Sequence, residues 1–145
     1  MKITIEATIY ADMDAVWQAW NSPADIMQWN AASADWHTTS STVDLREGDS
    51  FCSRMEAKDG SIGFDFSGTY TKIRPQQLIE YVMSDKRAVT TKFSREAGKI
   101  KVVTTFDAEG VHDGELQRQG WQSILDNFAR HGLSNIESNV VSQKF

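Results

Sequence analysis

The chain has 145 residues, enough to bury one hydrophobic core, and its hydrophobic fraction of 40% excludes a disordered protein. Its net charge of −5, with lysine and arginine scattered along the chain, excludes a nucleic-acid-binding protein, which needs clustered basic contacts to phosphate. A single cysteine excludes a disulfide framework, and the absence of long apolar runs and of a secretory signal predicts a cytoplasmic protein with no membrane span.

The first predicted elements are a strand and two short helices. Apolar and polar residues alternate over residues 2–9, which is typical of a half-buried strand. Asp12 is a favourable N-cap residue, and the apolar spacing after it predicts a helix as far as about Trp20. Ser22 and Pro23 then suit the cap and the first position of a second short helix over residues 22–29.

The middle of the chain is predicted to form an antiparallel sheet. The pattern changes to a period of two, with strands near residues 35–40, 43–57, 62–74, 77–84, 88–96 and 99–107. An Asp-Gly pair at 59–60 separates two of these patterns, which is a strong hairpin signal. In the last strand, Ile100, Val102, Thr104 and Phe106 occupy every second position, so one face of the sheet is expected to be buried.

The last predicted element is a long helix. Apolar side chains recur at helical spacing over residues 113–131, and Gly132 is placed to end the helix as a C-cap. Gly120 lies inside this helix, where glycine costs about 1 kcal/mol relative to alanine, so a close approach to the sheet is expected there. We expect a single domain of residues 1–135, followed by a tail of residues 136–145 that is either a loose end or a docked strand.

Together these elements predict an α+β fold. A curved antiparallel sheet of six to seven strands has one face to bury, and the only long amphipathic element that can cover it is the last helix. The two short helices after the first strand can close only one end. The space between the helix and the sheet is therefore either a cavity or a region filled by aromatic side chains.

Four motifs occur in order along the chain. They are the run at residues 11–29, the turn Asp44-Leu-Arg-Glu-Gly-Asp-Ser-Phe51, the strand end Gly68-Thr-Tyr-Thr-Lys-Ile-Arg-Pro75 and the pair Gly120-Trp121. They resemble the motifs of START-like (SRPBCC) proteins, in the branch of activator of heat-shock protein 90 ATPase homologues (AHSA-like). The resemblance spans about residues 3–133. It implies a helix-grip fold with a hydrophobic cavity, but not one activity, because related folds serve as lipid carriers, cyclases and co-chaperone modules.

Four of the five tryptophans lie within residues 17–36. Trp17 and Trp20 are expected in the core, with Trp17 against the last helix, because Val16 and Trp20 point the same way one turn apart. Trp29 and Trp36 flank a non-helical stretch where the mouth of a cavity is expected, so they are candidates to line it.

The leading functional prediction is non-enzymatic binding of a small hydrophobic or amphipathic ligand between the last helix and the sheet. Lys86 and Arg87 are expected to lie away from this site. The candidate ligand-binding residues are Trp29, Trp36, Phe51, Phe66, Tyr81, Phe93, Trp121, Leu125 and Phe128.

The sequence contains little that is typical of a metal-binding, cofactor-binding or catalytic site. His37, His112 and His131 are far apart in sequence, and none makes a close metal-ligand pair. Cys52 has no nearby basic partner in sequence and is expected to be a small buried residue of a strand. No nucleophile elbow, P-loop or dinucleotide fingerprint occurs. We therefore expect no metal, no cofactor and no catalytic residue.

Two alternatives remain from the sequence. One is a polyketide cyclase or aromatase-like enzyme, in which Arg54, Glu56, Asp65 and Tyr81 meet in the cavity, although Arg54 and Asp65 are expected to face outward. The other is a co-chaperone-like module that binds a protein. The separate N-terminal binding domain of full-length activators is not among these residues, so ATPase activation and a chaperone partner are not expected. A homodimer is left open.

Overall fold

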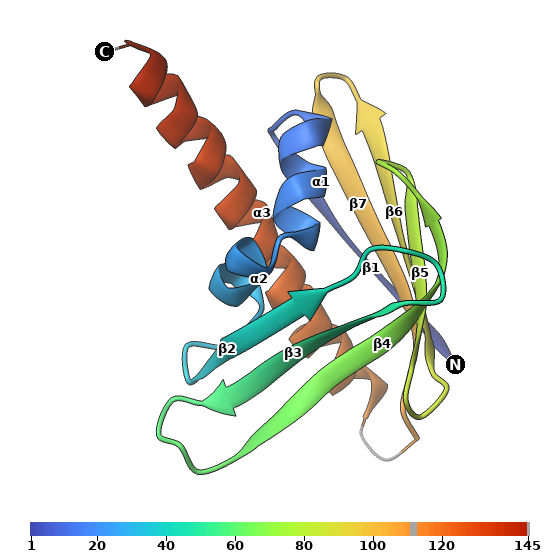
Figure 1. The fold of residues 1–145 in the computed structure, drawn as a ribbon. Helices are drawn as coiled ribbons and strands as arrows, with labels where there is room; N and C mark the ends of the chain where they lie inside the picture. Colours follow the sequence, from blue (N-terminus) through green and yellow to red (C-terminus); the bar gives the residue numbers. More distant parts are fainter. Residues whose placement is uncertain (111–112, 145) are drawn as a thin grey trace.

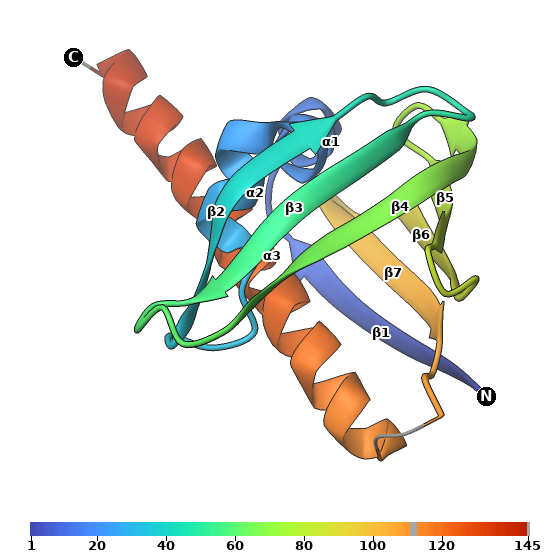
Figure 2. The same ribbon diagram turned by 60° about the horizontal axis from the view of Figure 1, so that its bottom comes forward.

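The computed structural model describes residues 1–110 and 113–144, with side chains as far as residue 131. It contains an antiparallel sheet of seven strands in the order β1-β7-β6-β5-β4-β3-β2. The sheet curls, so that β2, β3 and β4 lie across from β1 and β7 (Figures 1 and 2). The strands are β1 (Lys2–Ile9), β2 (Trp36–Val43), β3 (Ser50–Ala57), β4 (Gly63–Arg74), β5 (Leu78–Met83), β6 (Ala88–Glu96) and β7 (Lys99–Asp107).

Two short helices, α1 (Met13–Asn21) and α2 (Pro23–Trp29), follow β1. The Asp12 side chain accepts a hydrogen bond from the Ala15 backbone N–H at 2.8 Å, which confirms the predicted N-cap of α1. Ser22 occupies the N-cap position of α2, but its side chain makes no capping hydrogen bond. Pro23 at the first helical position carries no N–H, so this helix start has one unpaired backbone donor fewer.

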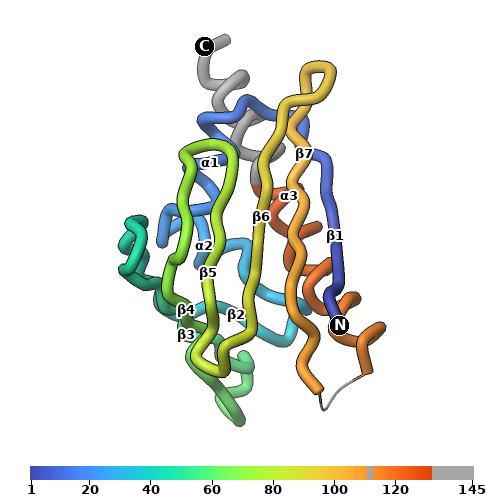
Figure 3. Tube along the Cα trace, turned by 90° about the vertical axis from the view of Figure 1, so that its right-hand side faces the viewer, coloured from blue at the N-terminus to red at the C-terminus, as the bar shows by residue number. Residues whose placement is uncertain are grey.

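The long helix α3 (Gly114–Lys144) crosses the open side of the curled sheet. Figure 3, which looks onto the outer face of the sheet, shows α3 behind the strands. Two of its side chains fasten it to β1: Arg118 donates to the Thr4 carbonyl oxygen at 2.6 Å, and Gln122 donates to the Glu6 carbonyl oxygen at 3.0 Å. The predicted α+β helix-grip fold, with a curved sheet around a C-terminal helix, is confirmed.

The buried face of the sheet follows the predicted alternation. Ile100, Val102, Thr104 and Phe106 of β7 are all buried, as are Ile3, Ile5 and Ile9 of the neighbouring β1. These strands pair in an antiparallel register that sets Ile3 opposite Phe106 and Ile9 opposite Ile100. Two long strands of the core therefore present rows of buried side chains toward α3, all of them apolar except Thr104.

The end of the last helix was predicted wrongly. α3 continues to Lys144, so Gly132 lies inside the helix, and the segment after residue 135 is part of α3 as far as Lys144. Residues 133–144 contain neither glycine nor proline, so no strong helix breaker follows Gly132, and one interior glycine costs only about 1 kcal/mol. The division into a domain of residues 1–135 and a tail of residues 136–145 stays a prediction.

Candidate functional site: a pocket between the last helix and the sheet

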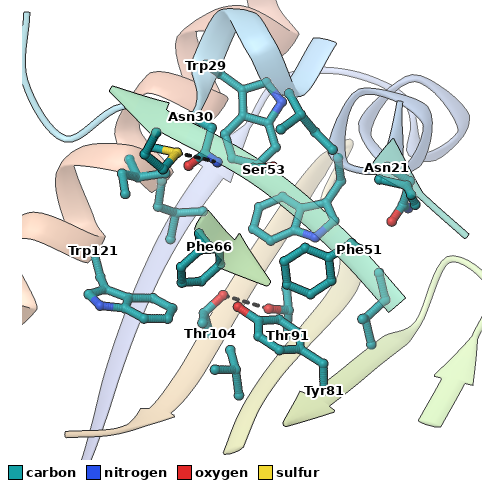
Figure 4. A pocket seen from close by; sticks show the side chains of 18 of the residues that line it. Asn21, Trp29, Asn30, Phe51, Ser53, Phe66, Tyr81, Thr91, Thr104 and Trp121 are labelled. Atoms are coloured by element: carbon teal, nitrogen blue, oxygen red, sulfur yellow. Dashed lines mark hydrogen bonds between the residues drawn. The ribbon is translucent and has the colours of Figure 1, made fainter. Parts of the chain in front are cut away.

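A pocket of about 390 Å³ lies between α3 and the concave face of the sheet (Figure 4). Residues from all seven strands form its floor and walls, Trp121, Ile124 and Leu125 of α3 line it on the other side, and residues of α1 and α2 border one end. Its size falls within the range of about 300–1,000 Å³ typical of small-molecule sites.

Aromatic side chains of three neighbouring strands form one wall. The ring of Phe51 packs edge-on against Tyr81, with centroids 4.8 Å apart, and lies 5.8 Å from Phe66. Gly68 of β4 makes this cluster feasible, because a Cβ atom there would lie 2.7 Å from Tyr81 Cδ2 and 2.8 Å from Phe51 Cε1. The absence of a side chain at Gly68 thus lets the two rings meet over the strand.

Trp20 of α1 and Trp29 of α2 close one end of the pocket. Their rings are stacked at 5.2 Å, and Phe128 of α3 packs edge-on against both, at 4.8 Å and 5.0 Å. The Trp29 indole N–H donates to the Ala19 carbonyl oxygen at 2.9 Å, which satisfies its polar atom inside the core. The three rings therefore join all three helices at this end.

Trp121 of α3 forms part of the opposite side. Its ring is stacked on Phe106 of β7, with centroids 4.1 Å apart and planes 10° apart, and meets Phe66 of β4 edge-on at 6.1 Å. Trp121 thus bridges two strands that lie on opposite sides of the curled sheet.

A few polar groups face this largely apolar space. Burial raises the pKa of Tyr81 well above its ordinary value, with a smaller contribution from nearby Tyr70, and Arg87 partly opposes the rise. Burial likewise raises the pKa of Tyr70 to about 12, helped by the charge of Asp44. Both hydroxyls therefore stay protonated at neutral pH and can donate hydrogen bonds. The hydroxyls of Thr91 and Thr104, which also line the pocket, lie 2.9 Å apart.

The structure brings six of the nine predicted site residues into the lining: Trp29, Phe51, Phe66, Tyr81, Trp121 and Leu125. Phe93 and Phe128 are buried in the core beside the pocket instead. Trp36 packs against Phe64 at 5.7 Å and does not line the pocket.

Three further placements differ from expectation. Trp20, expected in the core alone, lines the pocket, because its large ring reaches both Trp29 and the open space. Trp17 packs edge-on against Phe93 of β6, a contact with the sheet that was not expected. Arg87, expected to lie away, belongs to the lining, because it stands immediately before β6 at the end of a turn.

The expected close approach of the last helix at Gly120 is wrong. A Cβ atom at Gly120 would meet nothing within 4 Å, and Leu116, one turn earlier, is 62% exposed. The face of α3 that packs on the sheet carries Trp121, Leu125 and Phe128 instead. The apolar stripe of this helix is broad enough to accommodate either orientation, so the sequence pattern alone does not fix its rotation.

The residues proposed for an acid–base set do not converge on the pocket. Arg54 lies 3.1 Å from Glu56 and 3.4 Å from Asp65, and all three stay outside the lining, as expected for Arg54 and Asp65, while Tyr81 is inside it. Cys52 is half-buried rather than buried. Within the described residues, no three His, Cys, Asp or Glu side chains come together as metal ligands, and His112 lies outside the described residues.

Two contacts were not anticipated from the sequence. His131 Nε2 of α3 lies 2.8 Å from Asp25 Oδ1 of α2, and Asn127 of α3 donates to the Ala31 carbonyl oxygen at 2.6 Å. These bonds hold α2 and the segment after it against α3. No sequence signal pairs residues so far apart, because the contacts depend on how the helices pack.

For the described part of the chain, no helix has the length and apolar character needed to cross a membrane.

Comparison with known proteins identifies relatives over nearly the whole chain. The profile of the family described as Activator of Hsp90 ATPase homolog 1-like protein matches residues 10–132. The solution NMR structure of an AHSA1-like protein from Aeromonas hydrophila is 53% identical, with a TM-score of 0.85 and coverage of 90% of this chain and 91% of that one. A solution structure of a protein from Cytophaga hutchinsonii is 43% identical, with a TM-score of 0.81 and coverage of 94% of each chain.

More distant structures share the fold alone. A crystal structure of a protein from Nitrosomonas europaea has a TM-score of 0.80 at 13% identity, covering 93% of this chain and 96% of that one. None of the curated proteins matches the chain. The family profile spans α1, α2, the strands β2 to β7 and the part of α3 that lines the pocket, and the chain belongs to the Activator of Hsp90 ATPase homolog 1-like protein family, with its SRPBCC (START-like) fold.

Proposed function

We propose that the protein binds a small apolar or amphipathic ligand in the pocket between α3 and the sheet, without catalysing a reaction. One observation carries the proposal: aromatic side chains from α1, α2, α3 and three strands surround about 390 Å³ of space without filling it. Protein interiors are close-packed, and side chains that border a void lose dispersion contacts. A ligand with an apolar body would restore those contacts, which supports a binding role for the pocket.

The enzymatic alternative receives less support. An acid–base enzyme needs a titratable group in the pocket whose pKa is tuned toward neutral pH. The lining groups with shifted pKa values are Tyr70 and Tyr81. Both pKa values are raised, which moves them farther from neutral pH. Two tyrosines held protonated suit a site that donates hydrogen bonds better than one that abstracts protons.

The first experiment looks for a natural ligand. Native mass spectrometry of protein purified from its own host should show a retained molecule of small mass. Fatty acids, aromatic polyketides and flavonoid-like compounds should then be screened by thermal unfolding, since a ligand that binds only the folded state at 100 times its Kd adds about 2.7 kcal/mol of stability.

Matched variants locate the binding site. Trp121→Gln and Phe66→Gln change residues that face the pocket and should weaken binding at least about tenfold, since each adds an unsatisfied polar group to an apolar contact surface. Trp36→Gln and Lys86→Ala change residues outside the lining and should leave the affinity unchanged. If no compound raises the melting temperature and no mass is retained, the ligand-binding role fails, and a protein-interaction role becomes the better explanation. The cytoplasmic location and a homodimer stay predictions.

A further inference from the structure

Two threonines interrupt the apolar floor of the pocket. Thr91 of β6 and Thr104 of β7 are register neighbours, and their hydroxyl oxygens lie 2.9 Å apart. Both are almost fully buried, with exposed fractions of 1% and 4%, and the inward positions beside them are Val89 and Val102. Valine has the same shape as threonine and would avoid the cost of burying a hydroxyl, so packing alone does not account for this pair.

The threonine pair has one hydroxyl proton more than its mutual hydrogen bond uses. Two hydroxyls carry two protons, and their mutual hydrogen bond uses one. The second proton has no acceptor among the residues that the structure describes, and it borders the pocket. Val89, two residues before Thr91, is the register partner of Tyr81, so Tyr81 is a diagonal neighbour of Thr91 on the same face. The Tyr81 hydroxyl also lacks a partner within the described part of the chain.

We infer that the ligand carries a neutral hydrogen-bond acceptor oxygen, such as a carbonyl, which Thr91, Thr104 and Tyr81 bind at the floor of the pocket; this inference rests on the proposed function. The hydrogen-bond donors at the threonine pair are neutral hydroxyl groups. Arg87 is the single cationic side chain among the described lining residues, and it is already paired with Asp85 at 2.7 Å. A carboxylate at the threonine pair would be a buried charge without a free counterion, whereas a neutral oxygen avoids that desolvation cost.

The surroundings of the pair indicate where the oxygen lies in the ligand. Figure 4 shows Thr91 and Thr104 between Trp121 on one side and Phe51 and Tyr81 on the other. Apolar surface thus flanks the polar spot in both directions. A molecule with an internal carbonyl and an apolar group on each side matches this arrangement, whereas an acid with its oxygens at one end does not.

A pair of probes with nearly the same shape tests the inference. Benzophenone has a carbonyl between two rings, and diphenylmethane has a CH₂ group there. We expect the wild-type protein to bind benzophenone about 3- to 10-fold more tightly, as measured by calorimetry, since one net hydrogen bond accounts for a ratio of that size. In the double variant Thr91→Val/Thr104→Val the ratio should fall to about 1, and Tyr81→Phe should reduce it. Tyr81→Phe keeps the test valid if the double variant does not fold.

The chain supplies a matched control. Thr4 and Thr105 are register neighbours on β1 and β7 with hydroxyls 3.0 Å apart, but neither lines the pocket. Thr4→Val/Thr105→Val should leave the ratio as in the wild type. Equal affinities for both probes in the wild type would overturn the acceptor inference while the ligand-binding function stands. Binding of neither probe would overturn both, and a ratio that persists in the pocket variants would overturn the role of these three residues.

Discussion

Trp121 of α3 lies flat on Phe106 of β7, with ring centroids 4.1 Å apart and planes 10° apart. Phe106 is completely buried, whereas Trp121 also borders the pocket. One face of the indole is thus packed in the core and another part faces open space. This contact ties the long helix to the sheet at the position where the pocket wall begins.

Trp121→Ala should therefore cost less than the removal of a fully packed ring. Truncating a buried Phe or Trp typically costs about 3–5 kcal/mol, and we expect about 2–3 kcal/mol here, because part of the indole already borders a void. Chemical denaturation measures the change in the free energy of unfolding. A loss below about 0.5 kcal/mol would place the ring on the surface and contradict the stacked arrangement.

Phe128→Ala should have a larger effect. Phe128 is fully buried and packs edge-on against Trp20 and Trp29, so its removal leaves a cavity where α1, α2 and α3 meet. We expect a loss of about 3–5 kcal/mol in urea unfolding. Leu116→Ala, on the same helix but 62% exposed, is the control and should change stability by less than about 0.5 kcal/mol. Similar losses for both variants would mean that α3 is rotated differently.

Two glycine substitutions should act in opposite directions. A Cβ atom at Gly120 meets nothing within 4 Å, so Gly120→Ala should stabilise the protein by about 0.5–1 kcal/mol through the helix propensity of alanine. A Cβ atom at Gly68 would lie 2.7 Å from Tyr81, so Gly68→Ala should destabilise the protein and displace the aromatic wall. Thermal unfolding of both variants checks this. If Gly120→Ala destabilised the protein, the result would contradict the open space at Gly120 and support the close approach of α3 to the sheet that the sequence suggested.

Alkaline pH should weaken the fold through the pocket tyrosines. A tyrosine with a pKa raised by folding stabilises the folded state fully below its unfolded pKa of about 10, and this stability is lost as the pH rises through the folded pKa. For Tyr70 that window runs from about pH 10 to about 12. The free energy of unfolding should fall across this window, and Tyr70→Phe should reduce the fall. Parallel losses in the wild type and the variant would argue against burial of this hydroxyl.

Local patterns predicted most of the fold. The alternation over residues 2–9 matches β1, and the capping chemistry of Asp12 fixed the start of α1, because each signal depends only on neighbours in the chain. The strand predicted over residues 43–57 was too long, because β2 ends at Val43 and β3 begins only at Ser50, with the turn of the Asp44–Phe51 motif between them. The end of α3 could not be predicted, because a glycine is compatible with both a C-cap and an interior position.

The pocket could be predicted only in part. Phe51, Phe66 and Tyr81 were found because strand periodicity sets which residues share a face. Trp20 lines the pocket and Trp36 does not, which the sequence could not predict because it does not give the angle at which α1 and α2 meet the sheet. The hydroxyl pair of Thr91 and Thr104 depends on the pairing register of β6 with β7, which the sequence pattern does not specify.

The five tryptophans provide the most direct test of the ligand-binding claim. Each indole N–H gives its own NMR signal, and the structure divides them into Trp20, Trp29 and Trp121, which line the pocket, and Trp17 and Trp36, which do not. In a titration with benzophenone, we expect the signals of the first three to shift and those of the other two to stay in place. Shifts confined to Trp17 or Trp36, or no shift at saturating probe, would contradict a ligand site between α3 and the sheet.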